Sequence, residues 1–152
     1  MKLWRISNYA DLQGIGGLRA SGRWHTRGRP IVYLAESPPG ALIEVLVHVD
    51  VSRLEDLPDR YTLLTIEADG DIGLESCVDL PDDWAENRQV SRAAGDRWLE
   101  GARSALLRVP SAIMPGIWNV LLNPLHPDAH RLRITGTASL PFDRRLFKIV
   151  KP

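Results

Sequence analysis

The chain has 152 residues, a length that one hydrophobic core can stabilise, and we expect a single domain over residues 1–152. Hydrophobic residues make up 44% and charged residues 25% of the sequence, a balance typical of globular proteins that excludes disordered and fibrous classes. Nineteen basic residues balance nineteen acidic ones and no segment concentrates Lys and Arg, so the sequence predicts no direct binding of nucleic acid.

Cysteine content and the N-terminal residues indicate a compartment. Cys77 is the only cysteine, so no internal disulfide can form and a reducing environment is expected. The chain opens Met-Lys-Leu-Trp-Arg-Ile, without the long apolar segment of a signal peptide. No run approaches the roughly 18 apolar residues of a membrane span. We therefore expect a cytoplasmic protein without membrane association.

The first 35 residues indicate two strands joined by a long loop. Residues 3–6 and 31–35 are short apolar or alternating runs bounded by turn residues, which is typical of strands. Residues 12–30 are rich in glycine, and we expect a long, irregular surface loop there, a usual place for functional side chains. Its Gly-Ile-Gly-Gly sequence lacks the spacing of a Rossmann turn or a P-loop.

A helix is predicted over residues 38–49, because Ser37 can cap it and proline is tolerated in the first turn. Five apolar residues share one face of this helix: Ala41, Leu42, Val45, Leu46 and Val49. Glu44 and His48 lie four residues apart on an edge of that face.

The second half of the chain is mainly β-like. We expect a strand over 61–66, a polar connection over 69–83 and a helix over 86–103. Four more segments resemble strands and are separated by Pro, Gly and Asn clusters: residues 105–109, 117–122, 130–135 and 146–150. Six or seven strands with two helices predict an α+β fold around a compact mixed or antiparallel sheet.

Four residues are candidates for chemistry, each with a structural alternative. A carboxylate within Ala-Leu-Ile-Glu-Val-Leu-Val is costly to bury unpaired, so Glu44 is either a solvated helix edge or a functional group. His48, one turn later, either hydrogen-bonds that carboxylate or acts on a ligand. Arg23 is either an exposed loop arginine or a contact for an anion, and Tyr33 is either a core aromatic or a stacking ring.

Metal binding is the chief rival interpretation, since His126 and His130 are four residues apart with Asp128 between them. Pro127 indicates a turn rather than a helical face, so no metal site is expected. Ser111 could suggest a hydrolase, but no Gly-x-Ser-x-Gly motif surrounds it.

The order of these residues resembles the RES domain, a family named for an arginine, a glutamate and a serine that recur in its toxins. The resemblance spans nearly the whole chain and rests on these segments: Trp4-Arg5-Ile6, Ser21-Gly22-Arg23-Trp24-His25, Val32-Tyr33-Leu34-Ala35-Glu36-Ser37-Pro38, Ala41-Leu42-Ile43-Glu44-Val45-Leu46-Val47-His48, Val109-Pro110-Ser111-Ala112, Asn119-Val120-Leu121-Leu122-Asn123-Pro124-Leu125-His126-Pro127-Asp128 and Phe142-Asp143-Arg144-Arg145-Leu146-Phe147. One departure is His25, where many family members have asparagine.

The resemblance implies a fold similar to diphtheria-toxin-like ADP-ribosyltransferases and NAD⁺ as the substrate, with no metal. The implied catalytic residues are Arg23, Tyr33, Glu44 and Ser111. The implied NAD⁺-binding residues are Arg23, Tyr33, Ser111, Asn119 and Asn123, while His126 would shape the surroundings together with the two asparagines.

In such chemistry, breaking the nicotinamide–ribose bond leaves an oxocarbenium-like sugar that the carboxylate of Glu44 can stabilise. Arg23 would clamp the pyrophosphate or the adjoining ribose, and Tyr33 would stack on the nicotinamide. Ser111 would position the ribose or Glu44 through a hydrogen bond.

We therefore expect a toxin that cleaves NAD⁺ and passes ADP-ribose to water, phosphate or a protein. The alternatives are strict mono-ADP-ribosylation of one protein target and, in another class, a non-catalytic subunit that only binds a DNA-binding antitoxin. The resemblance implies an Xre-type antitoxin that blocks the active site, and it leaves open whether two copies of the toxin pair in the complex.

Overall fold

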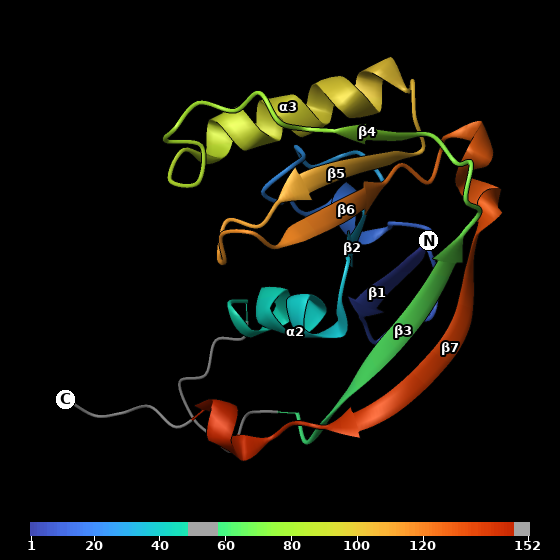
Figure 1. Cartoon of the computed structure of the whole chain (residues 1–152), viewed down its shortest axis with the longest axis vertical. Helices are drawn as coiled ribbons and strands as arrows, with labels where there is room; N and C mark the ends of the chain where they lie inside the picture. The colour runs from blue at the N-terminus through green and yellow to red at the C-terminus, as the bar shows by residue number, and fades with distance from the viewer. Residues whose placement is uncertain (49–57, 148–152) are drawn as a thin grey trace.

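A curved seven-stranded sheet forms the centre of the computed structural model, which describes residues 1–48 and 58–147 (Figure 1). The strand order is β4-β5-β6-β2-β1-β3-β7. The strands are β1 (Lys2–Ile6), β2 (Val32–Ala35), β3 (Arg60–Ala68), β4 (Leu74–Ser76), β5 (Leu106–Pro110), β6 (Trp118–Leu122) and β7 (Leu132–Pro141). Neighbours pair antiparallel except β4 and β5, which are parallel. The mixed sheet and its helices confirm the predicted α+β class.

Three α-helices accompany the sheet within residues 1–48 and 58–147: α1 (Gly16–Arg19), α2 (Pro38–Leu46) and α3 (Arg88–Gly101). Ser37 caps α2 as predicted, because its Oγ accepts a hydrogen bond of 3.1 Å from the Gly40 N–H. Asn87 caps α3 through the Gln89 N–H, and α3 ends at Ala102 in a left-handed conformation. Helix α2 begins three residues after the end of β2 and contacts β1 and β2, so one of its faces lies close to the sheet.

Two apolar clusters pack on opposite sides of the strands, as the alternation of strand side chains requires. Val120 and Leu122 of β6 belong to a cluster with β1, β2 and β3. Leu121 belongs to a second cluster in which Trp98 and Leu99 of α3 pack against β5. Helix α3 therefore covers the end of the sheet that contains β5 and β6 (Figure 1).

Two short elements interrupt segments that the sequence predicts to be irregular. The glycine-rich loop contains α1, a single turn whose Gly17 N–H bonds the Gly14 carbonyl. The connection over 69–83 contains β4, which pairs with β5 through only three residues. Neither four helical residues nor a three-residue strand can show a hydrophobic period, which explains why both were missed.

The strand predicted at 146–150 is wrong where the structure describes it. Leu146 and Phe147 belong to a 3-10 helix, Arg144–Phe147, and residues 148–150 lie outside the described residues. Asp143 begins this turn, since its side chain accepts a bond from the Arg145 N–H and its carbonyl accepts one from the Leu146 N–H.

Two other boundaries also shift. The helix predicted over 38–49 ends at Leu46, and residue 49 lies outside the described part of the chain. The segment predicted as a strand from residue 130 begins as the 3-10 helix Pro127–Arg131, after which β7 extends to Pro141. Within 1–48 and 58–147, no helix is both long and apolar enough to span a membrane.

Candidate active site

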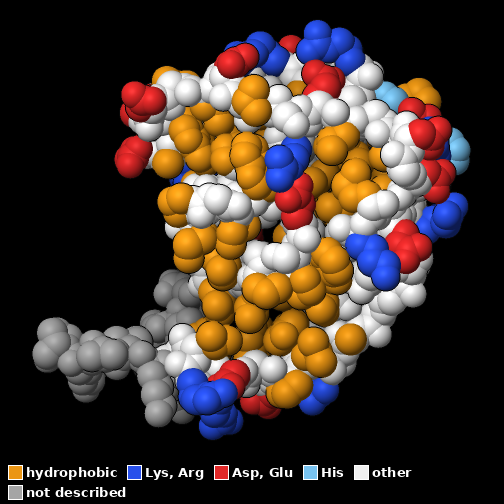
Figure 2. Space-filling model, viewed as in Figure 1, with side chains coloured by type: hydrophobic (Ala, Val, Ile, Leu, Met, Phe, Trp, Pro, Cys, Tyr) orange, Lys and Arg blue, Asp and Glu red, His pale blue; other side chains and the backbone are white. Residues whose placement is uncertain are grey.

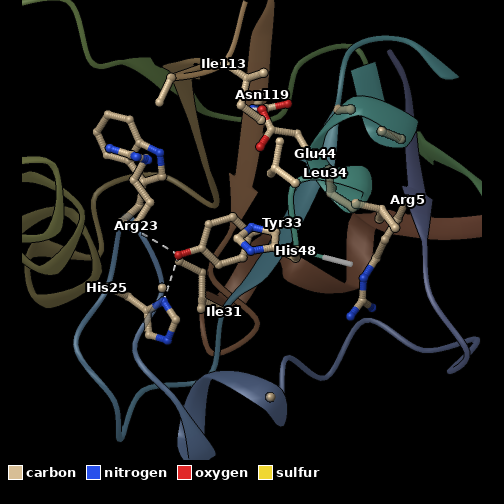
Figure 3. A pocket seen from close by; sticks show the side chains of 18 of the residues that line it. Arg5, Arg23, His25, Ile31, Tyr33, Leu34, Glu44, His48, Ile113 and Asn119 are labelled. Carbon is tan, nitrogen blue, oxygen red and sulfur yellow. Dashed lines mark hydrogen bonds between the residues drawn. The ribbon is translucent and has the colours of Figure 1, made fainter. Parts of the chain in front are cut away.

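A cavity of about 680 Å³ is lined by residues of β1, α1, β2, α2 and β6, by the first residue of α3, and by the loops that follow α1 and β5 (Figure 3). Small-molecule pockets in proteins commonly enclose roughly 300–1,000 Å³, so the cavity has room for a ligand of nucleotide size. Arg23, Tyr33, Glu44 and Asn119 all line it, which brings four of the predicted site residues together.

Glu44 is fixed in the cavity by two hydrogen bonds. Ser111 Oγ donates to Glu44 Oε1 over 2.8 Å, and Asn119 Nδ2 donates to the same oxygen over 2.7 Å. Among the described residues none donates to Glu44 Oε2. The half-buried carboxylate thus keeps one oxygen for a ligand while the other is fixed by protein. Glu44 is therefore not simply a solvent-exposed residue at the edge of its helix, which was the structural alternative for it.

Strand register explains why these three residues meet. Asn119 on β6 is paired with Ala35, the last residue of β2, and α2 starts three residues later. Asn119 is also paired with Val109 on β5, two residues before Ser111. The hydroxyl of Ser111 accepts the N–H groups of the loop that follows β5, so its own proton is directed to Glu44.

Asn119 holds Glu44 at a cost to its own hydrogen bonding. Its side chain is 8% exposed, and its Oδ1 is buried without a partner among the described residues. An unpaired buried carbonyl destabilises a fold by about 1–3 kcal/mol. Turning the amide over would place an oxygen against the Glu44 carboxylate, which is worse. The hydrogen bond to Glu44 accounts for why the amide keeps this orientation.

Tyr33 presents its ring to the cavity and its hydroxyl to the surrounding protein (Figure 3). The Trp24 N–H donates to Tyr33 Oη over 3.2 Å, and His25 Nδ1 lies 2.8 Å from the same oxygen. Burial raises the pKa of the Tyr33 phenol well above its usual value, so the hydroxyl is protonated near neutral pH.

Arg23 lines another wall of the cavity. Its Nη1 donates to the Ala85 carbonyl over 2.9 Å, and none of its described contacts is an ion pair. Burial lowers the pKa of Arg23 first, and the charge of Arg88 lowers it further, while Glu44 and Tyr33 act in the opposite direction. The guanidinium stays charged, and an anion between Arg23 and Arg88 would relieve their mutual repulsion.

The backbone around Arg23 is held by helix α3. Ser91 Oγ donates to the Arg23 carbonyl over 2.9 Å, and Arg92 Nε donates to the Gly22 carbonyl over 3.1 Å. These residues are adjacent on α3, and each binds backbone rather than a side chain. The Arg23 side chain itself lines the cavity and bonds the Ala85 carbonyl.

The same face of α3 continues the contact one turn later. A side chain at Gly95 would collide with the Trp24 carbonyl, so helix and loop touch backbone to backbone. The Asp96 carboxylate accepts both the Thr26 N–H, over 2.8 Å, and the Thr26 hydroxyl, over 2.6 Å.

The lining also includes two arginines and a histidine that sequence reasoning did not single out as site residues: Arg5, Arg88 and His25. Arg5 lies across the cavity from Arg23 in Figure 3, and its Nη1 donates to the Asp11 carbonyl over 2.9 Å. Burial lowers the pKa of Arg5, and the nearby Asp11 partly offsets that effect. The only sequence signal for Arg5 is its place in the Trp-Arg-Ile segment, because a lone arginine in a strand has no distinctive spacing.

Asn123 lies at the other end of β6 and does not line the cavity, so the structure does not bring it to Glu44. Its Oδ1 accepts the Leu125 N–H over 3.0 Å, and its own N–H donates to the Ala105 carbonyl. Nearby, His126 Nδ1 accepts the Asp128 N–H, which caps a 3-10 helix. Both residues shape a turn, and a turn of this kind is what Asn-Pro and His-Pro sequences favour.

His126 and His130 do not converge on a common point for a metal. His130 Nδ1 lies 2.7 Å from the Pro127 carbonyl, so each histidine is engaged within its own turn. In the part of the chain that the structure describes, no three His, Cys, Asp or Glu side chains are grouped closely enough to hold a metal ion.

Sequence comparison identifies relatives of similar length. "Toxin Res" of Pseudomonas putida KT2440 is 48% identical over 147 residues, which cover 97% of this chain and all of that protein. "Prs ADP-ribosylating toxin" of Sphingobium sp. YBL2 is 35% identical over 157 residues, covering 95% of this chain and 96% of that protein.

Structural comparison finds the same fold in a solved complex. A chain in the crystal structure of the M. tuberculosis MbcT–MbcA toxin–antitoxin complex matches with a TM-score of 0.75 and 19% sequence identity. The match covers 92% of this chain and 84% of that one. A family model, the RES domain, matches residues 2–144. With the model spanning nearly all of the sequence and relatives above 30% identity along its length, this chain belongs to the RES domain family.

Proposed function

We propose that this chain is the toxin of a toxin–antitoxin system and that it cleaves the nicotinamide–ribose bond of NAD⁺. One observation carries the proposal: a single cavity holds the fixed carboxylate of Glu44, the ring of Tyr33 and the guanidinium of Arg23. The names of two relatives, a toxin and an ADP-ribosylating toxin, support the same conclusion.

The charges of the cavity complement those of NAD⁺. The nicotinamide ring of NAD⁺ is a flat cation, which an aromatic face such as Tyr33 and a carboxylate such as Glu44 both attract. The pyrophosphate is an anion, which the planar fork of Arg23 can bind through paired hydrogen bonds. Arg5, on the opposite side of Tyr33, adds a second positive charge beside the ligand.

Bond cleavage follows from that placement. The electron pair of the glycosidic bond moves to the nicotinamide nitrogen, so the ring leaves as a neutral molecule and the ribose becomes an oxocarbenium-like cation. Glu44 stabilises that cation through the oxygen that no described residue binds, while Ser111 and Asn119 keep the carboxylate from turning away. An acceptor then adds to the ribose carbon and loses its proton.

Water, phosphate and a protein side chain are each suitable acceptors. The Sphingobium relative, named for ADP-ribosylation of Prs, favours transfer to a protein as the second candidate function. A non-catalytic subunit would need none of the groups that converge on Glu44, and measurable NAD⁺ loss by the isolated chain would exclude it.

The deciding experiment incubates purified protein with NAD⁺, with and without phosphate and with and without cell lysate. Mass spectrometry then follows nicotinamide and locates the ADP-ribose. Glu44→Gln is the matched control, because its amide oxygen can still accept from Ser111 and Asn119 while the charge is lost. We expect NAD⁺ loss with the native chain only. A folded Glu44→Gln variant with full activity would refute the assignment of Glu44.

We further propose an Xre-type antitoxin that occludes the cavity, with an acidic group paired to Arg23 in place of the pyrophosphate. The structural neighbour belongs to a toxin–antitoxin complex, which supports a protein partner. Figure 2 shows apolar side chains spread over much of one face of the chain, a surface that is typical of proteins with a binding partner. Simultaneous, independent binding of antitoxin and an NAD⁺ analogue in calorimetry would contradict occlusion.

A further inference from the structure

We infer that His25 is a positioning residue that anchors the Tyr33 hydroxyl and so fixes the orientation of the Tyr33 ring in the cavity. The inference rests on the proposed NAD⁺ chemistry for its effect on activity and on hydrogen-bond geometry for its structural part. His25 is 3% exposed, and both of its ring nitrogens have a partner within 3 Å. Buried imidazoles with two fixed partners hold one orientation.

The partners determine where the imidazole proton lies. His25 Nε2 lies 2.9 Å from the Ala20 carbonyl, which can only accept, so Nε2 carries the proton. Nδ1 of the neutral ring is then an acceptor, and the Tyr33 O–H donates to it over 2.8 Å. The Tyr33 oxygen in turn accepts the Trp24 N–H. The hydroxyl is thus held by one donated and one accepted hydrogen bond.

This network limits what Tyr33 can offer a ligand. The only proton of its hydroxyl is directed to His25, away from Glu44, as Figure 3 shows. Tyr33 therefore contacts a ligand with its ring face rather than as a hydrogen-bond donor. Two fixed bonds at the hydroxyl stop the ring from swinging on its side-chain torsions, which keeps the face in register with the carboxylate of Glu44.

The neighbouring backbone is built closely around this hydrogen bond. A Cβ at Gly22 would collide with Tyr33 Oη and would meet His25 Nδ1 at 2.9 Å. The Gly22 N–H bonds the His25 carbonyl, and Arg92 of α3 holds the Gly22 carbonyl. Any larger residue at position 22 would push the imidazole and the phenol apart.

Proton binding would reverse the network. Burial lowers the pKa of His25, although several groups packed against it modulate that effect. The backbone carbonyls of Ala20 and Gly17 and the carboxylate of Asp96 raise the pKa, and the charge of Arg92 lowers it. When the ring is protonated, Nδ1 becomes a donor to Tyr33 Oη, so this hydrogen bond reverses and the Tyr33 proton, which has lost its acceptor, is released toward other groups.

Two substitutions of His25 each remove one of its two hydrogen bonds, the bond of Nδ1 to Tyr33 or the bond of Nε2 to Ala20. The side-chain oxygen of Asn takes the place of His Nδ1, so His25→Asn keeps an acceptor for Tyr33 and loses the bond to Ala20. The side-chain nitrogen of Gln takes the place of His Nε2, so His25→Gln keeps the bond to Ala20 and loses the acceptor for Tyr33. A role limited to holding the loop would favour Gln, and a role in holding Tyr33 favours Asn.

We expect His25→Gln to lower kcat/KM for NAD⁺ consumption about tenfold, because this variant loses the hydrogen bond to the Tyr33 hydroxyl. His25→Asn keeps that bond and should lower kcat/KM less than about threefold. In a Tyr33→Phe background the two variants should become equal. The native chain should also lose activity in acid, with an apparent pKa below 6.5 that is absent in His25→Asn.

NMR of His25 tests the hydrogen bond to Tyr33 without any substrate, and so independently of the proposed reaction. Nitrogen NMR of His25 should show a proton on Nε2 and none on Nδ1, and the His25 pKa should rise in Tyr33→Phe, because the hydroxyl no longer stabilises the neutral ring. If the native chain does not consume NAD⁺, the proposed function fails while these spectra still decide the anchoring. A proton on Nδ1, an unchanged pKa in Tyr33→Phe, or equal activity of His25→Gln and His25→Asn in an active enzyme would overturn the inference.

Discussion

Replacing Asn119 by alanine should lower activity while leaving the stability of the fold nearly unchanged. The substitution removes a hydrogen bond to the Glu44 carboxylate, worth about 1.5–3 kcal/mol. It also removes a buried carbonyl that has no partner among the described residues, which costs about 1–3 kcal/mol. These contributions nearly cancel. We expect the free energy of unfolding of Asn119→Ala to stay within about 1 kcal/mol of the native value, since the cavity left behind is small.

Activity should respond differently, because Ser111 is then the one donor to Glu44 that remains among the residues described. A carboxylate held at one point can turn away from the developing charge, and we expect kcat to fall about tenfold, equivalent to about 1.4 kcal/mol of transition-state stabilisation. Urea unfolding gives the stability, and nicotinamide release at saturating NAD⁺ gives kcat.

Ser111→Ala is the matched control for this prediction. It removes the other donor to Glu44, and it also takes an acceptor from the N–H groups of Ile113 and Met114. Its kcat should fall by a similar factor, whereas its stability should fall by about 1–2 kcal/mol more than that of Asn119→Ala. If Asn119→Ala is the less stable variant, or if it retains full kcat, the reasoning about the unpaired carbonyl or about Glu44 is wrong.

Three other perturbations address the rest of the cavity. Arg23→Ala should raise KM for NAD⁺ about tenfold or more and weaken antitoxin binding in calorimetry, and unchanged affinities would give Arg23 a purely structural role. Since the pKa of His25 is lowered on folding, the unfolded chain binds a proton first. Stability in urea should therefore fall as the pH falls through 6.5, and a flat profile would contradict a buried neutral imidazole. Gly22→Ala should destabilise the fold and abolish activity because its Cβ collides with Tyr33. Gly101→Ala, with open space around it, should leave thermal stability unchanged or slightly higher, and equal effects of the two would refute the steric argument.

Periodic features of the sequence were predicted well. The apolar spacing around Glu44 predicted the helix that carries it, and the Ser37 cap placed the start of that helix correctly. The long helix α3 and the strands β1, β2, β3, β5 and β6 follow from 3.6- and 2-residue periods, which are local properties of the chain. Short elements such as β4 and the turn at Arg144–Phe147 carry no period, so they were missed or misassigned.

The contacts of the site could not be predicted from local patterns. Glu44 and Asn119 are 75 residues apart, and their hydrogen bond depends on the pairing of β2 with β6. Asn123 follows Asn119 by only four residues, yet it lies just past the opposite end of β6 and holds a turn instead. Only the resemblance to the RES domain linked Ser111 to Glu44, and nothing in the sequence indicated that His25 would anchor Tyr33.

The hydrogen bonds from helix α3 to the backbone of Gly22 and Arg23 affect when the site can form during synthesis on the ribosome. Arg23, Tyr33 and Glu44 all lie in the first third of the chain, but the bonds that hold the Arg23 backbone come from Ser91 and Arg92. A nascent chain that has emerged only as far as β3 contains these three side chains but lacks the residues that hold the Arg23 loop and Glu44 in the folded protein: Ser91, Arg92, Ser111 and Asn119. Since these contacts come from residues that are synthesised later, we expect the proposed NAD⁺-cleaving site to be complete only near the end of translation, which would give the proposed antitoxin time to bind.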